Sequence, residues 1–190
     1  MKSGLKIAYS PARLSSRVAR LGRAISHDYD GRTVDVVLIL ENAFIFGADL
    51  IRRISCPVVC HFVRSETREV KLGGYDRREI FFSHQPALKD RDVLLVDAVL
   101  HTGVTQDFLV KRLLESRPKA LRLAVLVDKP KARKVDLKPD YFGFVAASKQ
   151  LAGYGLAGRR GRYRNLPYIA VLPGAGSGVR RAGKRARSVR

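Results

Sequence analysis

The sequence predicts an α/β fold in which a mainly parallel β-sheet is flanked by helices. The apolar run Val93–Val96 is continuous, and Val34–Leu40 and Leu121–Val127 are apolar except for Asp35 and Arg122. Such runs, which do not alternate, are typical of strands buried on both faces. Segments with helical spacing of apolar residues separate these runs, and strands that alternate with helices join through right-handed crossovers into a parallel sheet. Ligands of such sheets bind beyond the carboxyl ends of the strands.

Three helices are predicted from capping residues and apolar spacing. The first begins at Ser10-Pro11, an N-cap followed by proline, and ends near Tyr29–Gly31. Its arginines form a basic face that either contacts RNA or is simply solvated. Further helical patterns run over Phe44–Ile54 and Thr105–Ser116.

The predicted strands are bounded by polar or turn-forming residues. A charged segment, Ser65–Arg78, has little apolar periodicity and is interpreted as a mobile loop or as a short hairpin with Glu79–Phe82. A basic connection, Lys129–Lys138, follows a later strand. The strands are expected at Val34–Leu40, Val58–Val63, Val93–Val96, Leu121–Val127, Phe142–Ala146 and Ile169–Leu172.

Length and charge bound the class of protein. The 190 residues suit one domain of ordinary size, predicted here over residues 1–173. The formal net charge of +20 attracts anionic ligands and permits contact with nucleic acid or an anionic membrane surface. Residues 174–190 are glycine-rich and then arginine-rich, so they cannot bury enough apolar surface to order themselves. They are predicted to form a disordered basic tail.

Cysteine usage and hydropathy predict a cytoplasmic protein that does not cross a membrane. Cys56 and Cys60 lack the further cysteines or clustered histidines of a zinc site, and we expect them to be reduced. The N-terminal residues have no apolar signal core, and no run approaches the roughly 18 apolar residues of a transmembrane helix.

The stretch Asp92–Gln106 carries the main functional signal. An apolar run ends in Asp97, and backbone amides at the start of the following helix hold phosphate readily. An acid at a strand end accepts hydrogen bonds from the vicinal hydroxyls of a sugar. The pattern predicts a ribose 5-phosphate site, with a capped turn that binds nothing as the alternative. The expected phosphate-binding residues are Thr102, Gly103, Val104 and Thr105.

Segments along nearly the whole chain, from about Ile7 to Leu172, resemble the type I phosphoribosyltransferases and, within them, the hypoxanthine-guanine branch. The resemblance implies a twisted parallel sheet with a small hood. It also implies transfer of ribose 5-phosphate from phosphoribosyl pyrophosphate (PRPP) to a purine, with Mg²⁺ on the pyrophosphate and, by family analogy, a homo-oligomer. The landmarks are Ile25–Gly31, Ala43–Leu50, Val93–Thr105, Leu126–Pro130, Asp140–Phe144, Gly153–Leu156 and Tyr163–Tyr168.

The resemblance assigns roles to individual residues. Asp97 corresponds to an acid that holds the ribose hydroxyls, and Arg164 matches the arginine that contacts pyrophosphate. Lys129 stands where a lysine meets the exocyclic oxygen of the purine, with a solvated lysine as the alternative. His101 replaces the loop aspartate that handles the purine N7 proton. It is interpreted as a catalytic group, a phosphate ligand or an exposed side chain.

Other positions depart from the family pattern. Ala98 stands in place of the second ribose acid and Ala157 in place of a metal-binding aspartate, so we expect Mg²⁺ binding to be weakened. The Lys-Gly pair of the pyrophosphate region is replaced by Glu41 and Asn42, which adds negative charge beside the expected pyrophosphate. The lid, which starts at Thr67-Arg68, is expected to be compressed.

The purine pocket is altered as well. Gln150, next to Leu151 in the base-binding segment, stands where an aromatic side chain stacks on the purine. The loss of several transition-state contacts lowers the rate by many powers of ten when the losses combine.

Three functional hypotheses follow. The first is a phosphoribosyltransferase of weak or altered activity. The second is an inactive regulator that binds PRPP or a nucleoside monophosphate, and the third is a nucleic-acid-binding protein that uses its basic surface and tail.

Overall fold

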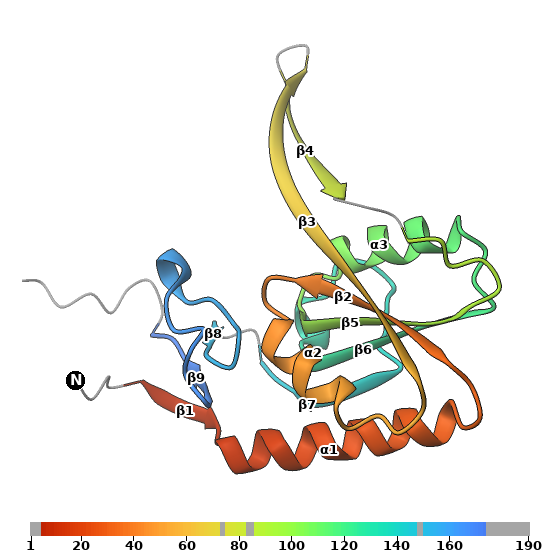
Figure 1. Ribbon diagram of the computed structural model, residues 1–190. Helices are drawn as coiled ribbons and strands as arrows, with labels where there is room; N and C mark the ends of the chain where they lie inside the picture. The colour runs from red at the N-terminus through yellow and green to blue at the C-terminus, as the bar shows by residue number, and fades with distance from the viewer. Residues whose placement is uncertain (1–4, 73–74, 83–85, 148–149, 174–190) are drawn as a thin grey trace, which may run out of the picture.

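The computed structural model describes residues 5–72, 75–82, 86–147 and 150–173, and it has a five-stranded parallel sheet at its centre (Figure 1). All neighbouring pairs among these five strands are parallel, as the sequence predicts. In sheet order the strands are β3 (Val58–Leu72), β2 (Val34–Leu40), β5 (Asp92–Leu100), β6 (Ala120–Asp128) and β7 (Tyr141–Val145).

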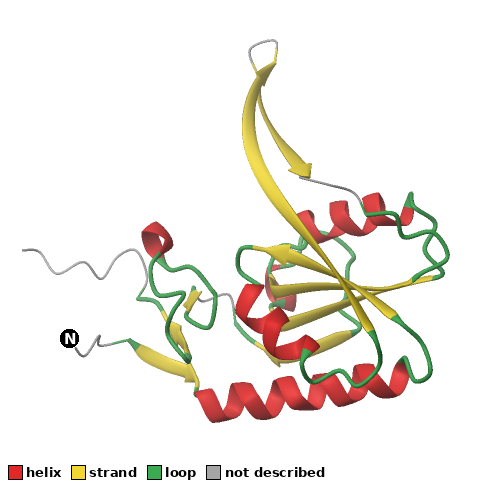
Figure 2. Ribbon diagram, in the orientation of Figure 1, coloured by secondary structure: helices red, strands yellow, loops and turns green. Residues whose placement is uncertain are grey.

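Helices cover both faces of this sheet (Figure 2). Alternate residues of a strand point to opposite faces, and this alternation divides the core into two layers. Val36 and Leu38 of β2 pack with helices α1 (Pro11–Asp28) and α2 (Phe44–Ile51). The intervening Val37 and Ile39 pack with helix α3 (Val104–Leu114) on the other face. Strand β2 is therefore buried on both sides, as its mainly apolar sequence predicts.

Strand β3 extends well beyond the predicted strand and forms a long hairpin with β4 (Tyr75–Phe82). The two strands pair antiparallel from Ser65 opposite Phe82 to Leu72 opposite Tyr75, and the ribbon stands away from the core (Figure 1). The prediction of a mobile loop or short hairpin underestimated this element. Its backbone is satisfied by cross-strand pairing, and a ribbon outside the core needs no apolar periodicity to form.

The hood is a separate three-stranded antiparallel sheet with the order β1-β9-β8. It consists of β1 (Lys6–Tyr9), β9 (Ile169–Val171) and β8 (Leu151–Ala152). Only β9 was predicted. Strands β1 and β8 have four and two residues, which are too few to show the alternation of apolar and polar residues that predicts a strand. They form because each pairs with β9.

Several element boundaries differ from the predictions. Strand β5 continues to Leu100, so Asp97 lies inside the strand rather than at its end. Helix α2 ends at Ile51, earlier than predicted. The predicted basic tail lies outside the described residues. Within the described part of the chain, no helix is long and apolar enough to cross a membrane.

Candidate functional site

Two adjoining cavities lie where the carboxyl ends of strands β2, β5 and β6 meet. The first, called the Asp97 cavity, has a volume of about 330 Å³, and the second, called the Lys129 cavity, has about 370 Å³. Both are lined by Asn42 and Val99, so they share a wall. The Asp97 cavity also contains Glu41, Thr105 and Arg164, whereas the Lys129 cavity contains His101, Gln150, Leu151 and Ala157. Most of the residues predicted for a site therefore converge here.

The Asp97 carboxylate is buried, with 7% of the residue exposed. Its Oδ1 accepts a hydrogen bond from the Ala98 amide at 2.6 Å, and its Oδ2 accepts one from Nε2 of Gln106 at 2.5 Å. Burial raises the pKa of the Asp97 carboxyl from 3.8 to about 6, although the hydrogen bond from Gln106 opposes this shift. Asp97 is thus a hydrogen-bond acceptor whose charge changes just below neutral pH.

Gln106 is a residue of the candidate site that the sequence reasoning missed. It lies in the first turn of α3, and its side chain is directed back toward the end of β5, where it contacts Asp97 and the carbonyl oxygen of Val99. The signal in the sequence is a polar residue on the face of the helix that also carries Leu109 and Leu113, both of which are buried. A buried amide of this kind is normally hydrogen-bonded, and here it orients the carboxylate.

The loop before α3 has the shape that an anion site requires. Gly103 has φ 81° and precedes a helix that begins without a side-chain cap, so amides of the first turn are not occupied by a capping side chain. A Cβ at this glycine would lie 2.8 Å from the Val135 side chain. The Lys134 amide also donates to the Thr102 carbonyl at 2.9 Å. The segment around Val135 therefore supports the loop, and Thr105 in the first turn of α3 lines the Asp97 cavity.

Glu41 faces two arginines across the Asp97 cavity. Its carboxylate accepts from Nη2 of Arg164 at 3.0 Å and from Nη2 of Arg64 at 3.4 Å. Arg164 also donates to the side-chain oxygen of Asn42 at 2.8 Å and to the Gly155 carbonyl at 2.7 Å. Sequence reasoning expected negative charge here and placed Arg164 nearby. It missed Arg64, which is brought to the site only by the pairing of β3 with β2.

The Lys129 cavity is lined by cationic and uncharged residues. Lys129 is buried, with 6% of the residue exposed, and desolvation lowers its pKa. His101 lines the same cavity. Its pKa is lowered, first by partial burial and then by the charges of Lys129 and Arg133. His101 is therefore biased toward its neutral form, in which one ring nitrogen accepts a proton.

The side chains of this site do not fit a Mg²⁺ ion held by the protein. In the described ranges no group of three or more His, Cys, Asp or Glu side chains is placed to hold a metal. Of the two carboxylates in the Asp97 cavity, Asp97 is engaged by Gln106 and Glu41 by two arginines. A phosphate-rich ligand would have to supply most of the oxygen ligands itself.

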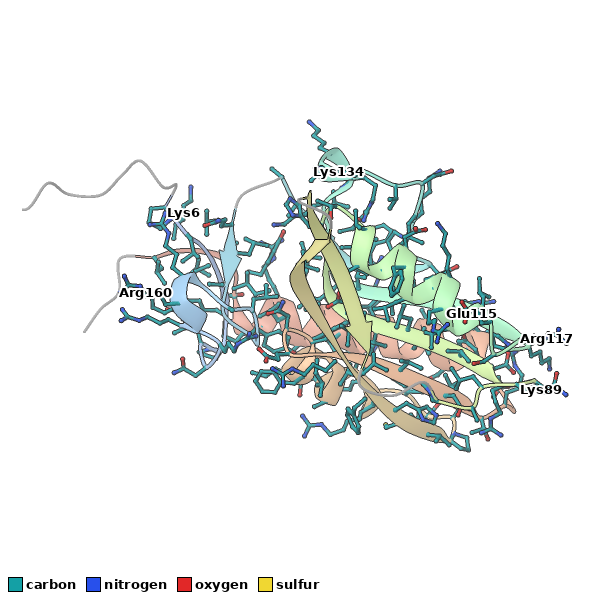
Figure 3. All side chains as sticks on the ribbon, turned by 90° about the horizontal axis from the view of Figure 1, so that it is seen from above. Lys6, Lys89, Glu115, Arg117, Lys134 and Arg160 are labelled. Carbon is teal, nitrogen blue, oxygen red and sulfur yellow. The ribbon has the colours of Figure 1, made fainter. Side chains whose placement is uncertain are left out.

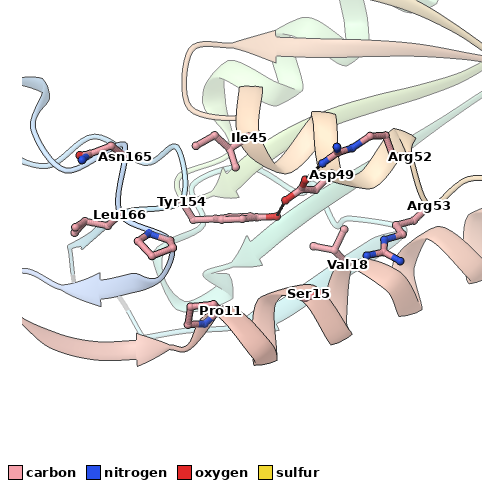
Figure 4. Close-up of a pocket in the computed structure, with 11 residues that line it drawn as sticks. Pro11, Ser15, Val18, Ile45, Asp49, Arg52, Arg53, Tyr154, Asn165 and Leu166 are labelled. Carbon is pink, nitrogen blue, oxygen red and sulfur yellow. Dashed lines mark hydrogen bonds and ion pairs between the residues drawn. The ribbon is translucent and has the colours of Figure 1, made fainter.

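A larger cavity of about 620 Å³ lies away from the strand ends, between α1, α2 and the hood (Figure 4). Tyr154 of the hood projects across it and donates a hydrogen bond to Oδ2 of Asp49 at 2.5 Å. Pro11 and Ser15 of α1 form another side. None of the residues predicted for a site lines this cavity. The hydrogen bond between Tyr154 and Asp49 joins the hood to α2.

The chain matches known proteins over most of its length. Residues 10–157 match the family model described as a phosphoribosyl transferase domain. The hypoxanthine-guanine phosphoribosyltransferase of Lactococcus lactis is 32% identical over 167 residues, which cover 88% of this chain and 90% of that protein. The bifunctional protein TilS/HprT of Listeria monocytogenes is also 32% identical over 167 residues, but the chain spans only 26% of its length.

Two solved structures have the same fold. The crystal structure of a hypoxanthine phosphoribosyltransferase from Staphylococcus aureus gives a TM-score of 0.81 at 28% identity and covers 91% of this chain and 96% of that one. A hypoxanthine-guanine phosphoribosyltransferase from Bacillus anthracis gives 0.76 at 31% identity, with 87% and 96% covered. Sequence and fold thus point to the same class of protein.

Proposed function

The chain belongs to the phosphoribosyltransferase family, on its hypoxanthine-guanine branch, and from this premise we propose that it transfers ribose 5-phosphate from PRPP to a purine base. The observation that carries the proposal is the placement of Asp97, Thr105 and Lys129 around two cavities with a common wall. A sugar in the Asp97 cavity would lie directly beside a base in the Lys129 cavity. Such proximity is the main requirement of a group transfer.

The Asp97 cavity is assigned to the ribose and its phosphates. The amides that begin α3, together with the Thr105 hydroxyl, hold the 5-phosphate, because a helix N-terminus favours an anion. Asp97 accepts hydrogen bonds from the ribose hydroxyls, and Gln106 keeps its carboxylate in place. Arg164 faces the pyrophosphate. Mg²⁺ would be held chiefly by the phosphate oxygens of PRPP, in keeping with the sparse carboxylates of the site.

The Lys129 cavity is assigned to the base. Lys129 donates to an exocyclic oxygen of the ring, and Gln150 and Leu151 form further walls. As the ring nitrogen bonds to C1′ of the ribose, the C1′–O bond to pyrophosphate breaks and pyrophosphate leaves with the electron pair. Neutral His101 accepts the proton that the base loses. The lowered pKa of His101 supports this role, since a general base must be unprotonated before it accepts a proton.

The activity is proposed to be weak or altered. Glu41 attracts Arg164 and Arg64, so a pyrophosphate must compete with a carboxylate for both guanidinium groups. Ala98 supplies no second acid to the ribose, and no Phe, Tyr or Trp side chain lines the Lys129 cavity among the described residues. Each lost contact of about 1.4 kcal/mol in the transition state lowers the rate tenfold.

The test is pyrophosphate release by the purified protein with PRPP, Mg²⁺ and hypoxanthine, guanine or xanthine. We expect turnover that falls about 10²-fold or more in His101→Ala, as for loss of a general base, while PRPP binding by calorimetry is retained. His27→Ala is the matched control, because His27 is exposed in the last turn of α1, far along the chain from the site. Turnover equal in both variants would remove His101 from the mechanism.

A second function is favoured by the pairing of Glu41 with Arg164, which lowers the positive charge available for pyrophosphate. In this alternative the protein binds PRPP or a nucleoside monophosphate without catalysis and acts as a regulator. Binding of either ligand without pyrophosphate release would select it. If neither PRPP nor a nucleoside monophosphate binds, both functions are wrong.

A further inference from the structure

Gln106 has one polar atom that its contacts within the protein leave unused. A glutamine amide has two N–H donors and one oxygen that accepts. The nitrogen Nε2 of Gln106 donates to Oδ2 of Asp97 at 2.5 Å and to the carbonyl oxygen of Val99 at 3.4 Å. Among the described residues, no group donates to its oxygen Oε1. Both donors are therefore engaged, and the acceptor is not.

The orientation of this amide is fixed by its neighbours. The two groups that Nε2 faces, the Asp97 carboxylate and the Val99 carbonyl, are both acceptors. If the end of the side chain were turned over, Oε1 would face the same two acceptors and both hydrogen bonds would be lost. The amide oxygen is therefore held on the side that faces neither of these groups.

The oxygen Oε1 is reached from the Asp97 cavity. Gln106 is buried, with 8% of the residue exposed, and it lines this cavity. In the described chain, the one side-chain nitrogen or oxygen that is enclosed without a partner is Nη1 of Arg133. Oε1 therefore keeps some contact with solvent, and the cavity provides it. Because buried polar groups normally have a partner, an unpaired oxygen at a cavity wall indicates a donor on the ligand.

The other carboxylate and amide side chains of the cavity are less available. Glu41 and Asn42 both accept hydrogen bonds from Arg164. Ala98 has no polar side chain and is buried in the core beneath α1 and α2, so no acceptor comes from its position. The Asp97 carboxylate and the unpaired amide oxygen remain as a neighbouring pair.

Two neighbouring acceptors match the vicinal hydroxyls of a sugar, because each hydroxyl has one proton to donate. Resting on the proposed transfer function, we propose that Oε1 of Gln106 accepts a hydrogen bond from one ribose hydroxyl while Asp97 accepts one from the other. Gln106 thereby supplies the second acceptor that Ala98 lacks, and it selects ribose over deoxyribose. The hydroxyls keep their protons, and Gln106 forms no covalent bond during the transfer.

Helix α3 carries Gln106 to this place. Seen from above in Figure 3, Lys134 and Glu115 mark the amino and carboxyl ends of the helix. Gln106 lies in the first turn, on the same buried face as Leu109. A neutral amide beside Asp97 adds an acceptor without adding a second negative charge, whereas two neighbouring carboxylates would repel each other.

The test measures the recognition of each hydroxyl by binding alone. Calorimetry at pH 8, where Asp97 with its pKa of about 6 is ionised, gives Kd for guanosine 5′-monophosphate and for its 2′-deoxy and 3′-deoxy forms. The proteins are wild type, Gln106→Met, which removes the amide while keeping the length of the side chain, and Leu109→Met. The last is the matched control, because Leu109 is buried one turn further along α3. Circular dichroism checks that each variant folds.

We expect the loss of either hydroxyl to weaken binding to the wild type about tenfold, because an acceptor is left unpaired. In Gln106→Met, the loss of one of the two hydroxyls should no longer weaken binding, while the loss of the other should still do so through Asp97. Leu109→Met should behave as the wild type. If Gln106→Met weakens all three nucleotides equally and keeps both hydroxyl effects, Gln106 only positions Asp97 and the proposal is wrong. The same loss of discrimination in Leu109→Met would also overturn it, since repacking of α3 would then be the cause.

Pyrophosphate release with PRPP and a purine, measured on the same proteins, separates this inference from the transfer function. Turnover by a wild type that binds a deoxy form as tightly as the ribonucleotide would refute the role of Gln106 and leave the transfer function standing. That result decides the matter even if Gln106→Met does not fold. Binding that depends on both hydroxyls, with one dependence lost in Gln106→Met but without turnover, would uphold Gln106 and refute the transfer function. Neither binding nor turnover would refute both.

Discussion

Replacing Asp97 with Asn should remove a pH dependence from the stability of the fold. Asp97 is buried, and its pKa is raised from 3.8 to about 6, mainly by this burial. A raised pKa means that the folded state holds a proton which the unfolded state has already released. Between pH 3.8 and about 6, unfolding therefore releases a proton, and stability falls as the pH rises.

The magnitude follows from the size of the shift. A change from 3.8 to about 6 corresponds to about 3 kcal/mol at 1.36 kcal/mol for each pH unit. The wild type should lose this amount of unfolding free energy relative to Asp97→Asn as the pH rises through the window. Above about pH 7 the difference between the two proteins should be constant.

Urea unfolding followed by far-ultraviolet circular dichroism suits the measurement, because the chain has no tryptophan. The unfolding free energy of wild type and Asp97→Asn is compared from pH 3.5 to 8, and their difference removes the titration of all other groups. Asp136→Asn is the matched control, since the Asp136 side chain is exposed. Parallel pH profiles for wild type and Asp97→Asn would refute the assignment of a raised pKa to Asp97.

Three further substitutions probe the site and its supports. Glu41→Gln should raise the affinity for pyrophosphate several-fold in calorimetry, because it removes a negative charge while keeping a hydrogen-bond acceptor, and unchanged or weaker affinity would contradict the repulsion. Tyr154→Phe should cost about 1 kcal/mol in urea unfolding, through loss of the bond to Asp49, and a neutral effect would show that this bond contributes nothing. Gly103→Ala should destabilise by roughly 1–3 kcal/mol, because the residue needs a positive φ and a Cβ would collide with Val135. The same variant should lose phosphate affinity in calorimetry, and full retention of both properties would rule out the proposed loop geometry.

Most of the sheet could be predicted from the sequence, for a physical reason. Strands such as Val34–Leu40 are buried on both faces, so their residues are almost all apolar, with Asp35 as the exception, and this requirement is written locally in the chain. The helix face of Leu14 and Val18 is encoded in the same way by its spacing. The order of these elements, with Asp97 in β5 and the glycine loop after it, was enough to locate the loop that we propose as the phosphate site.

The hairpin and the hood strands could not be predicted in this way. The outer part of β3 is held by β4, and β1 and β8 are held by β9, so their conformations depend on partners rather than on their own side-chain patterns. A charged or two-residue segment gives no periodic signal. Only the folded structure shows which strands pair and therefore which backbone N–H and C=O groups are hydrogen-bonded.

The sequence by itself determined most of the residues that line the candidate site, because the apolar run ending near Asp97 and the glycine before α3 are local features. Tertiary structure alone decided how those residues are engaged. Gln106 orients Asp97, Arg164 reaches Glu41 from 123 positions away, and Lys129 lies in a cavity without a lining acid in the described chain. Charge, burial and pKa depend on distances between elements, and these distances arise only when the sheet and the hood have assembled.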